Sequence, residues 1–284
     1  MKMIETRRCA LGIFVLLCML TLLPCYAGDE ADKQQQLGKW VMTYYQHPAP
    51  EQFVEKVKEM AAAGLLHNSK PNARPDANVM FLGKIMAANA DQISDWMDAL
   101  TSLPAADTTA LKRAVWYSGT AEGGAWLRAN GEADLANGPE PMMLSARPAM
   151  KWQPHHLDQL WEWFFATGEE KPVAKIISLF SLAHELPVDN SLKLLSPPRK
   201  SDNKTQYQIQ IYNYRLLRPA MWSTTSLAMQ HDRVLEILKH AREKHEHARI
   251  KAWLDQIIKI AETERAKQSK NEAKSGGDST NTDR

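Results

Sequence analysis

Apolar residues recur at three- and four-residue steps along most of the chain, a spacing that places them on one face of an α-helix. Prolines and acidic residues precede several of these runs and glycines end them, as at ordinary helix boundaries. Asp107 is expected to cap its helix. The pattern predicts an all-α protein with helices that begin at or just after Pro50, Asp76, Ile93, Asp107, Pro154 and Pro172, with Gly64 and Gly168 as stops.

The most apolar part of the chain predicts two helices joined by a short turn. One opens at Pro154 and closes at Gly168, and the next opens at Pro172. Because a turn of a few residues forces its two helices side by side, we expect an antiparallel αα-hairpin. Residues 84–100 and 222–238 repeat this layout without a strict period, which favours an irregular, α-solenoid-like array of αα-hairpins.

Residues 205–214 fit two patterns. Tyr207, Ile209 and Ile211 alternate with polar residues as in a strand, whereas Tyr207, Ile211 and Tyr214 also share one helical face. Since no other segment offers a clear partner strand, helix is the favoured prediction.

Three stretches lack a regular pattern and define the predicted organisation. Residues 131–153 are rich in glycine and proline and form the expected connector between an N-terminal helical part (28–130) and a C-terminal helical part (154–266). A second connector is predicted at 194–203. Residues 267–284 carry no large apolar anchor, so we expect a disordered tail there.

The N-terminus has the layout of a secretory signal peptide. Basic residues precede an apolar run from Ala10 to Leu23, and Ala27 stands at the expected cleavage point. The run is shorter than the roughly 18 to 20 residues that span a bilayer, so a cleaved signal is favoured over an uncleaved anchor. Lipid attachment at Cys25 fits poorly, because Pro24 occupies a position that needs a small residue.

Removal of the predicted signal peptide, residues 1–27, changes the chemistry of the chain. All three cysteines lie within it, so the mature protein has neither disulfides nor thiols. Three basic residues and one acidic residue leave with it, so Lys+Arg falls from 35 to 32 and Asp+Glu from 33 to 32. A neutral, cysteine-free exported chain is typical of a bacterial periplasm, and its neutrality argues against nucleic acid as a partner.

Positive charge nevertheless gathers locally. Between Lys193 and Arg218 there are six basic residues against Asp202 as the single acid. The first interpretation is a solvated loop and helix start, and the second is a contact for an anion or a lipid headgroup.

The histidines raise the question of a metal. His240, His245 and His247 form the densest group, but their spacings of five and two splay the rings, and only Glu236 and His240 lie four apart. The neighbouring pair at 155–156 is expected to point apart. We interpret the group as a charged helix face and predict no metal site and no cofactor.

Other candidate chemistry is equally weak. The glycines in 118–124 lack the lysine or preceding strand of a phosphate loop and favour close packing instead. Glu162 lies off the apolar stripe of its helix and is expected to be exposed and ion-paired. No serine, cysteine or paired histidine motif points to catalysis, so we predict no catalytic residue.

Aromatic residues are the remaining feature. Trp152, Trp161, Trp163, Phe164 and Phe165 fall within fourteen residues, more than one helical stripe can bury. One interpretation is that neighbouring hairpins cover both sides of this helix. The other is an exposed ridge in which Trp152, Trp163 and Phe165 bind a partner protein or peptide.

Two short motifs carry a resemblance to known proteins. The string LWEWFFATGE at 160–169, followed by Val173, Ile176 and Ile177, resembles uncharacterised exported helical proteins of proteobacteria. The turn at 232–234 is similar to that of HEAT- or TPR-like αα-repeats. The resemblance implies export and helical structure and brings no activity.

The favoured hypothesis is a periplasmic helical-repeat protein that acts as a protein–protein interaction module, such as an adaptor, an assembly factor or an immunity factor. One alternative is an enzyme whose site is assembled from residues dispersed along the sequence. Another is a membrane-tethered factor with an uncleaved leader, the one case in which membrane contact is expected.

Overall fold

The computed structural model describes residues 28–67, 75–139, 141, 144, 152–185, 200 and 202–277. Every regular element within these residues is a helix, which confirms the all-α prediction. The expected signal peptide and the connector residues 194–199 lie outside the described residues. The bounds of the elements are α2 (Gly28–Thr43), η1 (Tyr44–Gln46), η2 (Pro50–Gln52), α3 (Phe53–Ala62), α4 (Pro75–Ala88), η3 (Ala90–Gln92), α5 (Ile93–Ala99), α6 (Ala105–Ser118), α7 (Ala121–Ala129), α8 (Ala133–Ala136), α9 (Pro154–Thr167), α10 (Glu170–Ser178), η5 (Leu179–Glu185), α11 (Lys204–Gln230), α12 (Asp232–Lys244) and α13 (Ala248–Gly277).

Most helix boundaries follow the predicted signals. Gly64, two residues after the end of α3, and Gly168, directly after α9, adopt left-handed backbone with a φ of 67°. Glycine reaches this conformation without strain. Asp107 departs from its predicted role, because Pro104 occupies the N-cap position of α6. Asp107 is the third residue of α6, and its carboxylate is buried 2.6 Å from Nδ1 of His67. The carboxylate therefore makes a contact between distant segments and does not cap the helix.

The C-terminal half differs from the sequence prediction in two further places. Pro172 is the third residue of α10 and not its first, since Glu169 is the N-cap. The ambiguous segment 205–214 is helical, as favoured, but it continues without a break across Pro219 into the predicted helix at 222–230. An internal proline costs a helix about 3 kcal/mol. Buried neighbours on both sides of it, Leu217 and Ala220 among them, offset that cost.

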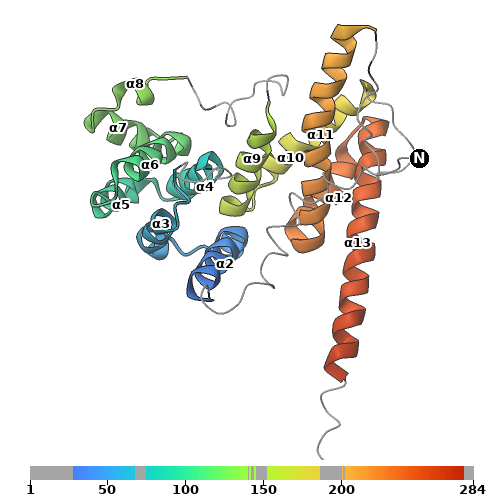
Figure 1. The fold of residues 1–284 in the computed structure, drawn as a ribbon, viewed down its shortest axis with the longest axis horizontal. Coiled ribbons are helices and arrows are strands. Elements are labelled where there is room, and N and C mark those ends of the chain that lie inside the picture. The colour runs from blue at the N-terminus through green and yellow to red at the C-terminus, as the bar shows by residue number, and fades with distance from the viewer. Residues whose placement is uncertain are drawn as a thin grey trace, which may run out of the picture.

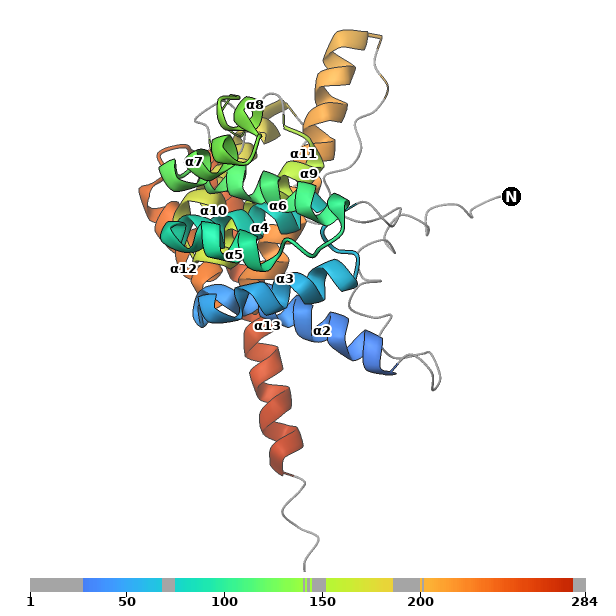
Figure 2. The same cartoon turned by 90° about the vertical axis from the view of Figure 1, so that its left-hand side faces the viewer.

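The helices are arranged on either side of a central pair (Figure 1). Helices α2 to α8 lie on one side, α11 to α13 on the other, and α9 and α10 lie between them. Contacts of α9 reach α2, η1 and α4 in the first group and α11 in the second. The first turns of α11 and the last turns of α13 project from this body in opposite directions (Figure 2). Helix α9 therefore joins the two halves of the protein.

Helix α4 is the most enclosed element of the N-terminal half, because it packs against both α6 and α9. Residues Val79 to Met86 are all buried, including Gly83 and the long side chain of Lys84. A Cβ atom on Gly83 would lie 2.6 Å from the carbonyl oxygen of Ala114 and 2.7 Å from Cβ of Tyr117. The absence of a side chain at Gly83 thus allows α4 and α6 to approach each other closely.

Two segments predicted to be irregular contain helix. The connector 131–153 includes the short helix α8. The predicted tail instead continues α13 from residue 267 to Gly277, and residues 278–284 lie outside the described part. Alanine, glutamate, lysine and arginine are strong helix formers, and an ion pair of 2.6 Å between Lys267 and Glu264 supports the exposed turns.

Within the described residues, no helix combines the length and the apolar character needed to cross a bilayer.

The substitution Gly83→Ala tests the close approach of α4 and α6. We expect it to lower the free energy of unfolding by about 1–3 kcal/mol, because the new methyl group meets backbone atoms that cannot rotate away. The matched control is Gly38→Ala in α2, where a Cβ atom meets nothing within 4 Å. That change should raise stability by about 0.5–1 kcal/mol through helix propensity alone. Denaturant titration of both variants measures the difference, and equal effects would contradict the packing.

Candidate functional site

The aromatic residues predicted to bind a partner are buried. Trp152, Trp163 and Phe165 expose 3%, 4% and 6% of their surface. The ring of Trp163 is covered by α4 and α10, with Nζ of Lys84 4.8 Å from the ring centre and Nζ of Lys171 5.4 Å from it. The exposed ridge expected at these three residues is therefore absent, and neighbouring helices cover both sides of α9 instead.

The remaining rings of α9 join it to residues far away in sequence. The ring of Phe164 lies 4.9 Å from that of Tyr45, and the ring of Phe165 lies 5.5 Å from the imidazole of His231. The indole nitrogen of Trp161 donates to the hydroxyl of Ser223 in α11 at 2.9 Å. Together these contacts connect η1, α9 and the junction between α11 and α12.

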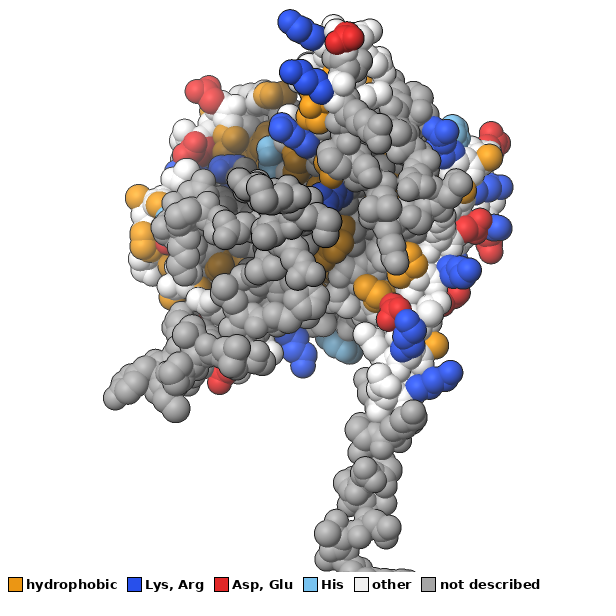
Figure 3. Space-filling view, turned by 45° about the vertical axis from the view of Figure 1, so that its right-hand side comes forward, with side chains coloured by type: hydrophobic (Ala, Val, Ile, Leu, Met, Phe, Trp, Pro, Cys, Tyr) orange, Lys and Arg blue, Asp and Glu red, His pale blue; other side chains and the backbone are white. Residues whose placement is uncertain are grey.

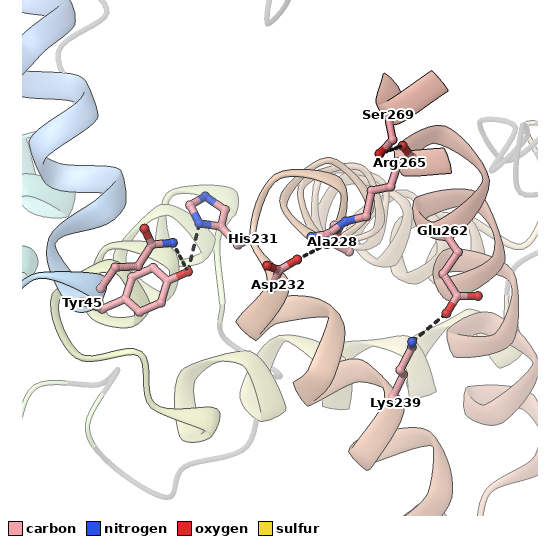
Figure 4. Close-up of polar contacts among 9 residues, drawn as sticks. Tyr45, Ala228, His231, Asp232, Lys239, Glu262, Arg265 and Ser269 are labelled. Atoms are coloured by element: carbon pink, nitrogen blue, oxygen red, sulfur yellow. Dashed lines mark hydrogen bonds and ion pairs between the residues drawn. The ribbon is translucent and has the colours of Figure 1, made fainter. Parts of the chain in front are cut away.

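His231 stands at the centre of this connection (Figure 4). It is the N-cap residue of α12, only 4% exposed, and its Nδ1 lies 3.1 Å from the hydroxyl of Tyr45. Its Nε2 is buried and has no hydrogen-bond partner. Burial, and then the positive charge of Arg265, lower the pKa of His231 below its ordinary value of 6.5, while Asp232 opposes the shift. The neutral imidazole is the form that fits this site.

His240, from the histidine group that was weighed as a metal site and interpreted as a charged helix face, contacts another helix. Nδ1 of His240 lies 3.1 Å from a carboxylate oxygen of Glu170, which ties α12 to α10. Glu236, four residues before His240, pairs with Arg233 instead. Among the described residues, no group of three or more histidine, cysteine, aspartate or glutamate side chains is placed to hold a metal ion.

The other weak candidates take structural positions. The rings of the pair 155–156 lie 4.1 Å apart and do not point away from each other, because the second ring turns back to accept a hydrogen bond from the backbone of Gln153. Glu162 is partly buried, where exposure was expected. In the glycine segment, Thr120 caps α7 by accepting from the Gly123 N–H, and a Cβ on Gly123 would lie 2.7 Å from Oγ of Ser118. Close packing explains that glycine.

Helix α11 has an exposed face. Its sequence indicates the positive charge that gathers between Lys193 and Arg218, but not the exposed apolar side chains beside that charge. Among the described residues, three large apolar side chains are exposed, namely Ile209, Trp222 and Ile260, and Trp222 at 49% is the most exposed of them. Trp222 lies on a line of α11 residues opposite the helix face that packs into the core. This line, which we name the outward row, consists of Lys204, Gln208, Ile211, Arg215, Arg218 and Trp222.

The outward row carries all the charge of its helix. Lys204, Arg215 and Arg218 are exposed, and α11 contains no aspartate or glutamate along its 27 residues. Figure 3 shows basic side chains gathered on the projecting part of α11, next to apolar ones. The spacing of four and three from Lys204 onward is visible in the sequence, but it identifies a surface only once the opposite face is known to be buried.

Comparison with known proteins gives no matching family model, no matching curated protein and no matching solved structure. The resemblance of the central hairpin to exported helical proteins thus stays a prediction.

The pH dependence of stability tests the environment of His231. Because its pKa is lowered in the folded state, the unfolded chain binds the proton more readily, and we expect the free energy of unfolding to decrease as pH falls below about 6.5. The variant His231→Asn keeps a polar partner for Tyr45 but does not titrate, so it should lose this part of the decrease.

Denaturant titrations between pH 8 and pH 5 provide the measurement. The matched control is His47→Asn, which removes an exposed histidine from the same half of the molecule as Tyr45. This control shows the effect of the same substitution at an exposed position. A His231→Asn variant with the full pH dependence of the unmodified protein would contradict a buried, neutral imidazole.

Proposed function

We propose that this protein is a periplasmic interaction module, a helical scaffold that binds another protein. The observation that carries the proposal is the position of Trp222, half exposed on the side of α11 that faces away from the core. Burial of an exposed tryptophan is among the largest single contributions to protein–protein affinity. In a chain that encloses the rings of α9 so completely, the exposed indole of Trp222 on α11 is suited to a partner.

The scaffold in this proposal is an irregular array of αα-hairpins. Helices α9 and α10 pack against each other across the turn at Gly168, and α11 and α12 do so across His231. Stacked helix pairs of this kind present long surfaces, and such surfaces commonly bind proteins. The periplasmic location rests on the signal-peptide pattern of the N-terminus and on a mature chain without cysteine.

The proposal places partner binding on α11 and not on α9. Trp152, Trp163 and Phe165 contribute to the stability of the scaffold, because each is more than nine-tenths buried. A partner can reach Trp222 without any rearrangement of the core. An enzyme assembled from dispersed residues, the alternative considered from the sequence, gains no comparable support from the described residues.

Affinity capture with the variant Trp222→Ala tests the function. Loss of a central tryptophan typically costs 2 kcal/mol or more of binding energy, so we expect partner recovery to fall about 30-fold or more. The matched control is Ile260→Ala, which truncates the exposed apolar residue of α13 and should leave recovery unchanged. Denaturant titration of both variants checks that each remains folded under the conditions of the capture. Identical recovery of every bound protein by Trp222→Ala and the unmodified chain would overturn the proposal.

A further inference from the structure

The outward row of α11 is long enough to contact an extended partner segment. From Lys204 to Trp222 it spans 18 helical steps, about 27 Å at the usual rise of 1.5 Å per residue. Its members recur at steps of four and three, so they lie along one line of the helix surface. The opposite face is buried against the core by residues that include Leu217, Ala220 and Thr224. The row thus lies on the side of α11 opposite its buried face, with Trp222 half exposed.

Three of the six residues in the row, Arg215, Arg218 and Trp222, are of types that dominate protein interfaces. Arginine, tryptophan and tyrosine are enriched among the residues that contribute most to binding. Arg218 is also held in place by its own helix, since its guanidinium donates to the hydroxyl of Tyr214 at 2.9 Å and lies 5.9 Å from that ring. A guanidinium restrained in this way loses less conformational freedom when a carboxylate binds it.

The positive charge of the row favours a partner with negative charge. Arg215 and Arg218 lie next to each other in the row, and Lys204 adds a third positive charge. No acidic residue of α11 neutralises them, and Asp202, just before the helix, is outweighed by Lys200 and Lys204 on either side of it. Two adjacent guanidinium groups favour carboxylates, which they can bind through paired hydrogen bonds. They also repel a basic segment.

A membrane surface fits the row less well than a protein does. Helices that lie in a bilayer interface bury a continuous apolar face. Here Arg215 and Arg218 separate Ile211 from Trp222, and the exposed Ile209 lies off the row on another side of the helix. The row therefore offers a single aromatic anchor beside a pair of cations, which matches a protein segment.

We infer that the outward row binds an acidic protein segment, with carboxylates paired to Arg215 and Arg218 and an apolar side chain covering Trp222. The inference rests on the proposed function and adds the chemistry of the partner. It predicts that binding weakens as salt concentration rises, because charge pairs at a protein surface are screened by ions.

Photo-cross-linking in the native cells identifies what contacts the row. The photoreactive amino acid p-benzoylphenylalanine replaces Gln208, an exposed row position between Lys204 and Ile211, and in a control protein it replaces the exposed Lys58 of α3. We expect position 208 to cross-link to a protein segment whose acidic residues outnumber its basic residues by at least two. Position 58 should not cross-link to this segment. Mass spectrometry of the cross-linked peptide gives its sequence.

Charge variants then test the identified segment as a synthetic peptide against the whole protein. Each of Arg215→Gln and Arg218→Gln should weaken binding about tenfold, as expected for a lost hydrogen bond to a charged group. The control pair Arg128→Gln and Arg249→Gln removes the same charge from exposed positions of α7 and α13 and should not change the affinity.

The outcomes separate the inference from the function on which it rests. A cross-linked segment that is neutral or basic, or whose affinity is unaffected by Arg215→Gln and Arg218→Gln, would overturn the acidic partner while leaving a protein-binding function. Cross-links from position 208 to lipid alone, or the absence of any cross-linked protein, would overturn the acidic partner along the row. The capture experiment with Trp222→Ala decides the protein-binding function separately.

Discussion

Five large aromatic rings within fourteen residues set the constraint on which the structure depends. One helical stripe cannot bury all of them, because residues two apart, such as Trp161 and Trp163, point to different sides. The fold meets this requirement by covering α9 on both sides, with α4 and α10 around Trp163 and with α11 beside Trp161. The helix that buries the most aromatic surface therefore becomes the one that joins the two halves of the chain.

The same constraint explains details at the junction of the two halves. Gly168, which ends α9, leaves room for Tyr45, since a Cβ atom there would lie 2.9 Å from Cδ2 of that ring. The Tyr45 hydroxyl then meets His231, which begins α12 and packs against Phe165. The rings of α9 thus connect three residues that are far apart in sequence, namely Tyr45, Gly168 and His231. A change at one of them affects the packing of the others.

Local patterns of sequence predicted the all-α class and many of the helix boundaries, because spacing and end signals act within a few residues. Their failures have a common cause in tertiary packing. Helix α11 continues across Pro219 because Leu217 and Ala220 are buried beside it. Asp107 contacts His67 and does not cap its helix. The positive charge of the site was evident from the sequence, but its exposed tryptophan was beyond prediction for the same reason. Whether Trp163 or Trp222 is exposed depends on which helices cover it, and the sequence gives no direct signal of that.

The central claim is that the rings of α9 are enclosed and that the accessible aromatic surface lies on α11. All nine tryptophans lie in the described residues, and Trp222, at 49%, is the most exposed of them. Oxidative footprinting of the native protein, with each tryptophan quantified by mass spectrometry, measures this directly. We expect Trp222 to be modified fastest and Trp152, Trp161 and Trp163 to be protected until the protein unfolds. Modification of Trp163 as fast as that of Trp222 would contradict the account.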